Sequence, residues 1–120
     1  PVAYEEGYEP FLLLLSATAP PFDERLSGYG RNKCLQVFHL HAMGCEFQVL
    51  HSGCLLHLPH PPSDACSRTL PTFSGPDKKQ AESRLVEIKA LYRAAKLELL
   101  QAHAVPQYSH EQTRVPAMLA

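Results

Sequence analysis

The sequence predicts an α/β fold made of short strands, a central helix of about three turns and a long C-terminal helix. Three patterns support this prediction: an apolar run at Phe11–Leu15, helical spacing of apolar residues between Asn32 and Met43, and a longer helical stripe that begins after Pro76. With 120 residues, the chain is long enough for a single hydrophobic core. We therefore expect these elements to pack into one domain.

The first predicted element is a strand that leads into a loop. Phe11–Leu15 is wholly apolar and is flanked by Pro10 and Ser16, which favours a short buried strand over a helix. Paired prolines and two glycines then predict a loop from Ser16 to Gly30. The charged cluster Asp23-Glu24-Arg25 lies on this loop, where functional side chains are often found.

The central helix is predicted over Asn32–Met43. Leu35, Phe38 and Ala42 recur there at three- and four-residue spacing, which places them on one helix face. Asn32 suits the N-cap position because its side-chain oxygen can accept from the first free backbone amides. Gly44 follows the last apolar residue and suits the C-cap.

Two further strands are predicted after this helix. Cys45–Leu50 alternates apolar and polar residues, with Phe47 and Val49 on the apolar face, which is the pattern of a half-buried strand. After a turn, Cys54–Leu58 is predicted as the next strand. Pro59 ends that strand, since proline offers no amide to a sheet ladder.

The long C-terminal helix is predicted to begin at residues 74–77. Ser74 and Asp77 stand three residues apart with a proline between them, a pattern that starts helices. Its apolar stripe consists of Leu85, Ile88, Tyr92, Ala95 and Leu99. We interpret this stripe as a face that packs on the sheet, rather than on a membrane or a partner. Residues 104–120 show no period, so we expect a folded lobe over 1–103 and a flexible tail over 104–120.

The composition argues against several classes of protein. Lysines and arginines number 11 against 12 acidic residues, so no strong field favours nucleic acid. No apolar run approaches the roughly 20 residues that span a bilayer, so no membrane segment is predicted. The four cysteines form no C-x-x-C pair, which disfavours a zinc site or a redox motif. In an oxidising lumen two of them can pair, with three connectivities open.

Several separate blocks of sequence resemble one enzyme family. They are Tyr8-Glu9-Pro10-Phe11, Pro21-Phe22-Asp23-Glu24-Arg25, Gly28-Tyr29-Gly30 with Asn32-Lys33, Gly44-Cys45-Glu46-Phe47-Gln48-Val49-Leu50 and His57-Leu58-Pro59-His60. In order and spacing they are similar to LARGE-type transferases and the related β-1,4-glucuronyltransferase, which form glycosyltransferase family 49. A weaker likeness extends to Leu91-Tyr92-Arg93. The resemblance implies the acceptor-side, C-terminal portion of a GT-A glycosyltransferase domain.

Such enzymes transfer a sugar from a nucleotide donor to an acceptor hydroxyl. The resemblance therefore implies a UDP-sugar donor carrying glucuronate, xylose or N-acetylglucosamine, a glycan acceptor, and Mn²⁺ as cofactor. It also implies a place in the Golgi lumen, within a single-pass type II membrane protein. The sequence has no Asp-x-Asp motif, and the nucleotide-binding βαβ region is not in it. We therefore expect a fragment that is inactive alone.

The candidate catalytic residues lie on and just after the loop. Asp23 and Glu24 are candidates for orienting an acceptor hydroxyl or accepting its proton. A structural interpretation also stands, in which they cap the loop and pair with Arg25. Arg31-Asn32 replaces an acidic pair of the wider GT-A fold, and the Asn32 amide cannot take a proton.

Two further loop residues are candidates for binding the acceptor. Arg25 is one of them. Tyr29 is the other, although an aromatic residue between two glycines is as often a turn anchor.

The candidate metal ligands are His57 and His60. The resemblance implies that His57 lies near the donor diphosphate, and imidazole suits a divalent transition metal. A structural, hydrogen-bonded histidine is the alternative. Because Mn²⁺ prefers several oxygen ligands, we expect weak metal binding by this chain. We interpret His39 and His41 as surface or packing residues, since two residues apart on a helix they point about 200° from one another.

Two other functions are kept open. The missing Asp-x-Asp motif allows a non-catalytic relative that binds carbohydrate or protein. Seven histidines and four cysteines also allow a small metal-binding protein of another class, although their spacing gives this little support.

Overall fold

The computed structural model describes residues 1–103 and 116–119 and shows a mixture of helices with a few short strands. In chain order the elements are β1 (Leu12–Leu13), α1 (Asn32–Ala42), β2 (Glu46–Val49), α2 (Asp64–Thr69), the 3-10 helix η1 (Gly75–Asp77), α3 (Lys78–His103) and β3 (Pro116–Leu119). This mixture agrees with the α/β class predicted from the sequence.

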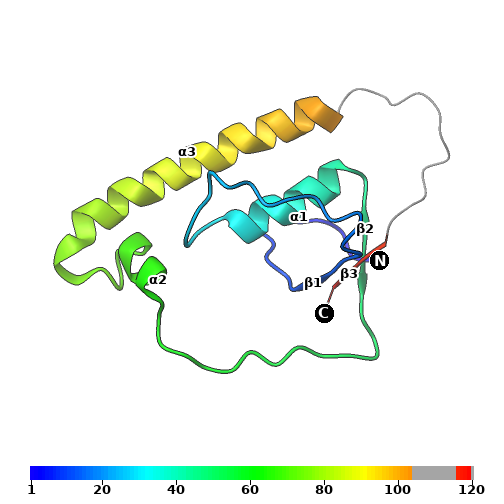
Figure 1. The fold of residues 1–120 in the computed structure, drawn as a ribbon, viewed down its shortest axis with the longest axis horizontal. Helices are drawn as coiled ribbons and strands as arrows, with labels where there is room; N and C mark the ends of the chain where they lie inside the picture. The colour runs from blue at the N-terminus through cyan, green and yellow to red at the C-terminus, as the bar shows by residue number, and fades with distance from the viewer. Residues whose placement is uncertain (104–115, 120) are drawn as a thin grey trace.

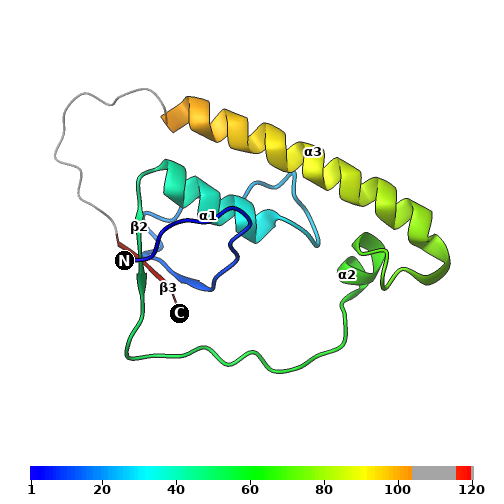
Figure 2. The same cartoon turned by 180° about the vertical axis from the view of Figure 1, so that it is seen from behind.

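Helix α1 lies in the middle of the molecule, between α3 and the strands (Figures 1 and 2). It is buried almost all round. One side packs on α3, and the other side packs on β2 and the N-terminal segment. The first core cluster contains Leu26, Cys34, Leu35, Phe38, Ile88, Tyr92 and Ala95. The second contains Val37, Leu40 and Phe47. The predicted stripe of α3 is confirmed at Ile88, Tyr92 and Ala95, which are buried together with Ala81. The stripe was predicted to pack on the sheet, whereas it packs on α1.

The sheet has three strands in the order β1-β3-β2. Strand β3 runs antiparallel to β1, with Leu12 opposite Leu119, and parallel to β2, with Phe47 opposite Ala117. An isolated antiparallel bridge also joins Val2 to Phe47. The sequence placed residues 116–119 in a flexible tail, whereas they form this central strand. The rest of the predicted tail, 104–115 and 120, lies outside the described residues.

The ends of α1 are set by backbone geometry. The predicted N-cap, Asn32, is the first helical residue, and the N-cap is Arg31, in the left-handed region with φ of 62°. At the other end, Gly44 has φ of 81°, which glycine adopts without strain. Its N–H donates to His41 O at 2.9 Å, and the Cys45 N–H donates to Leu40 O at 3.0 Å. This pair of bonds is a Schellman motif, and it confirms the predicted C-terminal glycine.

The prediction of a strand at Cys54–Leu58 is wrong. The segment at 53–63 has no regular secondary structure, and Leu56 and Leu58 are 82% and 70% exposed. A strand needs a neighbour to satisfy its backbone groups, and none of the described strands lies beside this segment. An apolar run by itself cannot supply that neighbour. The segment therefore crosses the molecule as an extended connection to α2 (Figure 1).

Helix α2 was not predicted. Ser63 is its N-cap, and the Ser63 hydroxyl oxygen accepts from the Cys66 N–H at 3.2 Å. The 3-10 helix η1, which leads into α3, begins at the predicted point with Ser74 at its N-cap position, but the Ser74 side chain makes no capping hydrogen bond to it. The Ser74 hydroxyl instead lies 2.7 Å from Leu70 O and 2.6 Å from Ser67 O, so it satisfies carbonyls at the end of α2. These contacts fix α2 to the start of α3.

Candidate functional site

The loop carboxylate Asp23 is held by an arginine. Arg25 donates through Nη2 to Asp23 Oδ2 at 2.7 Å and to Glu98 Oε2 of α3 at 2.6 Å. These ion pairs tie the loop to the long helix. The hydrogen bonds from Arg25 lower the pKa of Asp23, so its carboxylate stays ionised and is a weak base. The structural interpretation of Asp23 is therefore supported by its contacts.

Glu24 differs from its neighbour. It is exposed, and among the described residues it has no hydrogen bond or ion pair. Arg25, the predicted acceptor-binding residue, has its guanidinium occupied by two carboxylates. A cavity of about 280 Å³ lies beside this ion triad, and its lining includes Phe22 and His39 as well as Asp23, Arg25 and Glu98. An acceptor hydroxyl would have to compete with those carboxylates for Arg25.

Tyr29 and Asn32 lie on either side of the turn into α1. The ring of Tyr29 is 43% exposed. Interaction with Cys66 of α2, followed by partial burial, raises the pKa of Tyr29. Asn32 Oδ1 accepts from the Lys33 N–H at 3.0 Å. Within residues 1–103, neither side chain is hydrogen bonded to Asp23 or Glu24, so the predicted catalytic residues do not form one connected group.

His57 and His60 lie together on the extended segment. Their rings are stacked, with centroids 5.2 Å apart, and the Phe11 ring meets His57 edge-on at 6.3 Å. Ring nitrogens direct their lone pairs in the ring plane, so two stacked rings do not aim at one point. Within the part of the chain that the structure describes, no group of three or more His, Cys, Asp or Glu can hold a metal. The residues present therefore do not fit a complete Mn²⁺ site.

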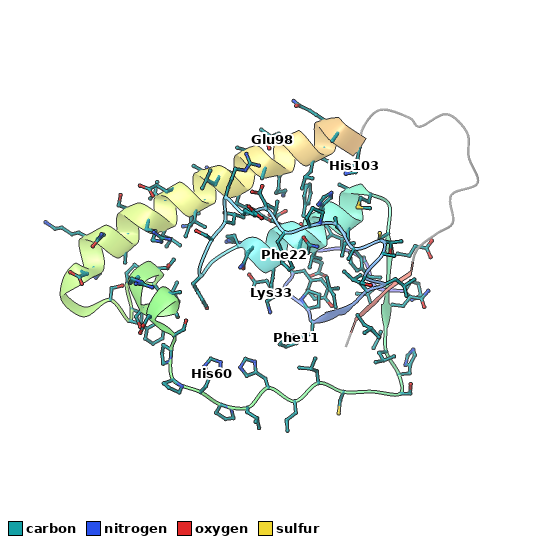
Figure 3. All side chains as sticks on the ribbon, in the orientation of Figure 1. Phe11, Phe22, Lys33, His60, Glu98 and His103 are labelled. Atoms are coloured by element: carbon teal, nitrogen blue, oxygen red, sulfur yellow. The ribbon has the colours of Figure 1, made fainter. Side chains whose placement is uncertain are left out.

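A groove of about 530 Å³ lies next to the histidine pair. It runs between the β1 segment, the loop and the start of α1, and its lining includes Phe11, Phe22, Lys33 and Gln36. The Lys33 ammonium lies 4.5 Å from the centroid of the Phe11 ring. Gln36 Nε2 donates to Pro20 O at 2.6 Å, which holds the loop against the helix. Figure 3 shows Phe11 and Lys33 between Phe22 and the segment that carries His60.

This groove combines exposed aromatic rings with a cation, as small-molecule sites often do. Sequence reasoning missed these two rings because Phe11 was predicted to lie in a buried strand and Phe22 was assigned no role. Their exposure, 40% and 57%, is visible only in the fold. His60 lies on the other side of the molecule from Glu98 (Figure 3). Phe22 and Gln36 line both this groove and the cavity beside Glu98.

Residues 1–65 match the family model of glycosyltransferase family 49, described as the glycosyl-transferase for dystroglycan. The chain belongs to this family. The match includes the Asp23–Arg25 loop, helix α1 and both candidate metal ligands, which confirms the resemblance read from the sequence. Family 49 membership also agrees with the mixed helix and strand content.

Curated relatives match the chain over different lengths. The glycosyltransferase-like protein gnt14 of Dictyostelium discoideum is 42% identical over 62 residues, or 52% of this chain and 10% of that protein. The xylosyl- and glucuronyltransferase LARGE2 of Mus musculus is 32% identical over 103 residues, or 84% of this chain and 15% of that protein. The xylosyl- and glucuronyltransferase LARGE1 of Danio rerio is 36% identical over 62 residues, or 52% of this chain and 8% of that protein.

The chain thus spans only about a tenth of the length of these relatives. No solved structure matches it. Among the described residues, no helix is both long and apolar enough to cross a membrane.

Proposed function

We propose that this chain forms the acceptor-side part of a GT-A catalytic domain in a nucleotide-sugar-dependent glycosyltransferase. The whole protein transfers a sugar from a UDP-sugar to a glycan hydroxyl in the Golgi lumen, as a single-pass type II membrane protein. The observation that carries this proposal is the family match over residues 1–65, which spans both the loop and the histidine segment.

Xylose and glucuronate are the first donor sugars in the proposal, with N-acetylglucosamine third. Xylose and glucuronate are placed first because the LARGE relatives are named xylosyl- and glucuronyltransferases. The family description names dystroglycan, so its glycans are the first acceptors to test. The groove beside Phe11 and Lys33 is the proposed place for the sugar rings.

Glu24 is the proposed general base. Asp23 is a poor choice because Arg25 holds its carboxylate and lowers its pKa. Glu24 extends from the same loop without a partner among the described residues, so its carboxylate is free to accept a proton from a sugar hydroxyl. Arg25 and Asn32 then act by shaping the loop, and Tyr29 borders the acceptor.

Mn²⁺ is the proposed cofactor of the whole catalytic domain, where it would neutralise charge on the donor diphosphate. His57 is the first candidate ligand and His60 the second. Since these two residues do not complete a metal site, the oxygen ligands would have to come from elsewhere in the protein.

A chimera tests this proposal. Residues 8–63 replace the aligned segment of mouse LARGE2, and transfer from UDP-xylose and UDP-glucuronate is then measured. We expect a chimera that retains transfer, and Glu24→Gln in it should lower kcat about 100-fold because a general base is lost. Asp23→Asn is the matched control and should change kcat less.

A chimera that folds and is secreted but transfers no sugar would contradict the proposal. It would favour the alternative, a non-catalytic relative that binds carbohydrate or protein. An equal loss from Glu24→Gln and Asp23→Asn would instead remove Glu24 as the base. Calorimetry of the chimera with UDP-sugar and Mn²⁺ distinguishes the enzyme from the non-catalytic relative, since a competent enzyme binds its donor.

A further inference from the structure

A second groove lies along α3 and differs in character from the site above. It has a volume of about 800 Å³ and runs between the N-terminal segment at Glu6-Gly7, the start of α1 and the middle of α3. None of the site residues predicted from the sequence lines it. Helix α3 lies across the molecule from the segment that carries His60 (Figures 1 and 3), so this groove is a separate site.

The groove is strongly basic. Its lining contains four cationic side chains, Arg31, Lys89, Arg93 and Lys96, and a single carboxylate, that of Glu6. Glu6 is already engaged, because it accepts from Lys96 Nζ at 2.5 Å and from the Tyr92 hydroxyl at 3.0 Å. The carboxylate therefore neutralises only one of the four cations.

Two of the cations have no partner in this part of the chain. Lys89 and Arg93 are exposed and lie four residues apart on α3, which places them on one helix face. Within residues 1–103 neither has a hydrogen bond or an ion pair with an acidic side chain. Two like charges at this spacing repel one another, and an anion between them would relieve that repulsion.

The backbone and side-chain contacts of Arg31 position its guanidinium to bind such an anion. Of the described residues other than glycine, Arg31 alone has a positive φ, 62°, which strains the backbone. Its guanidinium lies 5.5 Å from the centroid of the Tyr92 ring, and its Nη1 lies 3.9 Å from Cys34 Sγ. The strained backbone and these two contacts thus place a planar guanidinium at the groove.

We infer that this groove binds an oxyanion, the phosphate or carboxylate group of a small ligand or a glycan. Arg31 supplies paired donors to two oxygens, and Lys89 and Arg93 supply the balancing charge from α3. This binding does not depend on sugar transfer or on the proposed function, because none of its residues belongs to the loop or the histidine pair.

The test uses the 120-residue chain and two simple oxyanions. Pyrophosphate and glucuronate are titrated separately, with neutral glucose as the comparison, and binding is followed by ¹H–¹⁵N NMR shifts and calorimetry. The variant is Lys89→Gln with Arg93→Gln. The matched control is Lys78→Gln with Lys79→Gln, which removes two exposed cations from the same helix but outside the groove.

We expect saturable binding of at least one oxyanion, with shifts at residues around Arg31 and Tyr92. The Lys89 and Arg93 variant should weaken this binding about tenfold or more, since two charge-assisted contacts are lost. The control should change it less than about twofold. Tighter binding of pyrophosphate identifies a phosphate ligand, and tighter binding of glucuronate identifies a carboxylate ligand.

Equal weakening by both double variants would show that only general charge attracts the anion, and it would overturn the inference. Absence of saturable binding by both oxyanions would overturn it as well. All four substituted lysine and arginine side chains are exposed, so a preserved NMR spectrum is expected and confirms that the variants remain folded.

Discussion

Helix α1 and the segment at 51–63 belong to the same family-matched stretch, yet they are stabilised very differently. In α1, Leu35 and Phe38 are 3% and 5% exposed, because α3 covers one side of the helix. In the segment, Leu56 and Leu58 are 82% and 70% exposed. The described part of the chain therefore builds a core around α1 and leaves the leucines of the segment that carries the candidate metal ligands exposed.

The difference follows from how each element satisfies its backbone. A helix makes its hydrogen bonds within itself, so α1 and α3 need only one another's apolar faces. An extended segment needs a neighbouring strand, and the described residues offer none at 53–63. Residues on α1 should therefore control stability, whereas residues on the segment should not.

Among the changes that test this comparison, truncation of Phe38 should have the largest effect on stability. Phe38→Ala removes a ring that packs in the cluster with Ile88 and Tyr92, and should lower the free energy of unfolding by about 3–5 kcal/mol. Leu56→Ala is the matched control on the segment, and should change it by less than about 0.5 kcal/mol. Urea unfolding followed by circular dichroism measures both values.

Similar losses from the two truncations would contradict the comparison, because Leu56 would then be buried in solution. In that case the segment would have to pack against some part of the chain or against a second copy.

Cysteine alkylation tests the same comparison with single side chains, one in α1 and one on the segment. Cys34 is 2% exposed in the core, and its burial raises the pKa of its thiol to about 11, whereas Cys54 on the segment is exposed. Because the thiolate is the reactive form, iodoacetamide at pH 8 should modify Cys54 about a hundredfold faster or more. Mass spectrometry of timed digests measures the two rates.

The control is the same reaction in denaturant, where the two cysteines should react at comparable rates. A rate difference that persists in denaturant would arise from local sequence and not from the fold. Rapid modification of Cys34 in the native chain would mean that the contact between α1 and α3 opens often.

Helices α1 and α3 could be predicted from sequence because their signals are local. The apolar spacing over α1 and its glycine stop at Gly44 lie within a few residues of each other, and so does the stripe of α3. The partner of a strand is not local. Nothing within Cys54–Leu58 indicates whether a neighbour is present, and nothing near 116–119 indicates a position between β1 and β2.

The contacts of the candidate site also divide into local ones, which the sequence could predict, and long-range ones, which it could not. The pairing of Asp23 with Arg25 was predictable, since the two residues are separated by one position. The third member, Glu98, lies 73 residues from Arg25, and only the packing of α3 brings it close. The same holds for Glu6 with Tyr92, 86 residues apart, so the basic groove had no sequence signal.

The contacts of Glu6 should have the smallest effect on stability, and this effect should depend on pH. The hydrogen bond from Lys96, assisted by Tyr92, lowers the pKa of Glu6 below its ordinary value of 4.5. A group with a lowered folded pKa stabilises the protein above its unfolded pKa, and that stability is lost as the pH falls through the folded value. Because the Glu6 side chain is 59% exposed, solvent screening limits the contribution to less than about 1 kcal/mol.

Replacement of Glu6 isolates this contribution. Glu6→Gln should be slightly less stable than the parent chain at pH 7, and the difference should shrink as the pH falls from about 5 to 3, measured by urea unfolding across that range. Some pH dependence should remain in the variant, since Arg25 also lowers the pKa of Asp23. A difference that stays constant with pH would mean that Glu6 acts through packing of its side chain. The contact between the N-terminal segment and α3 would then rest on the neutral contacts of Tyr4 and Tyr92 rather than on an ion pair.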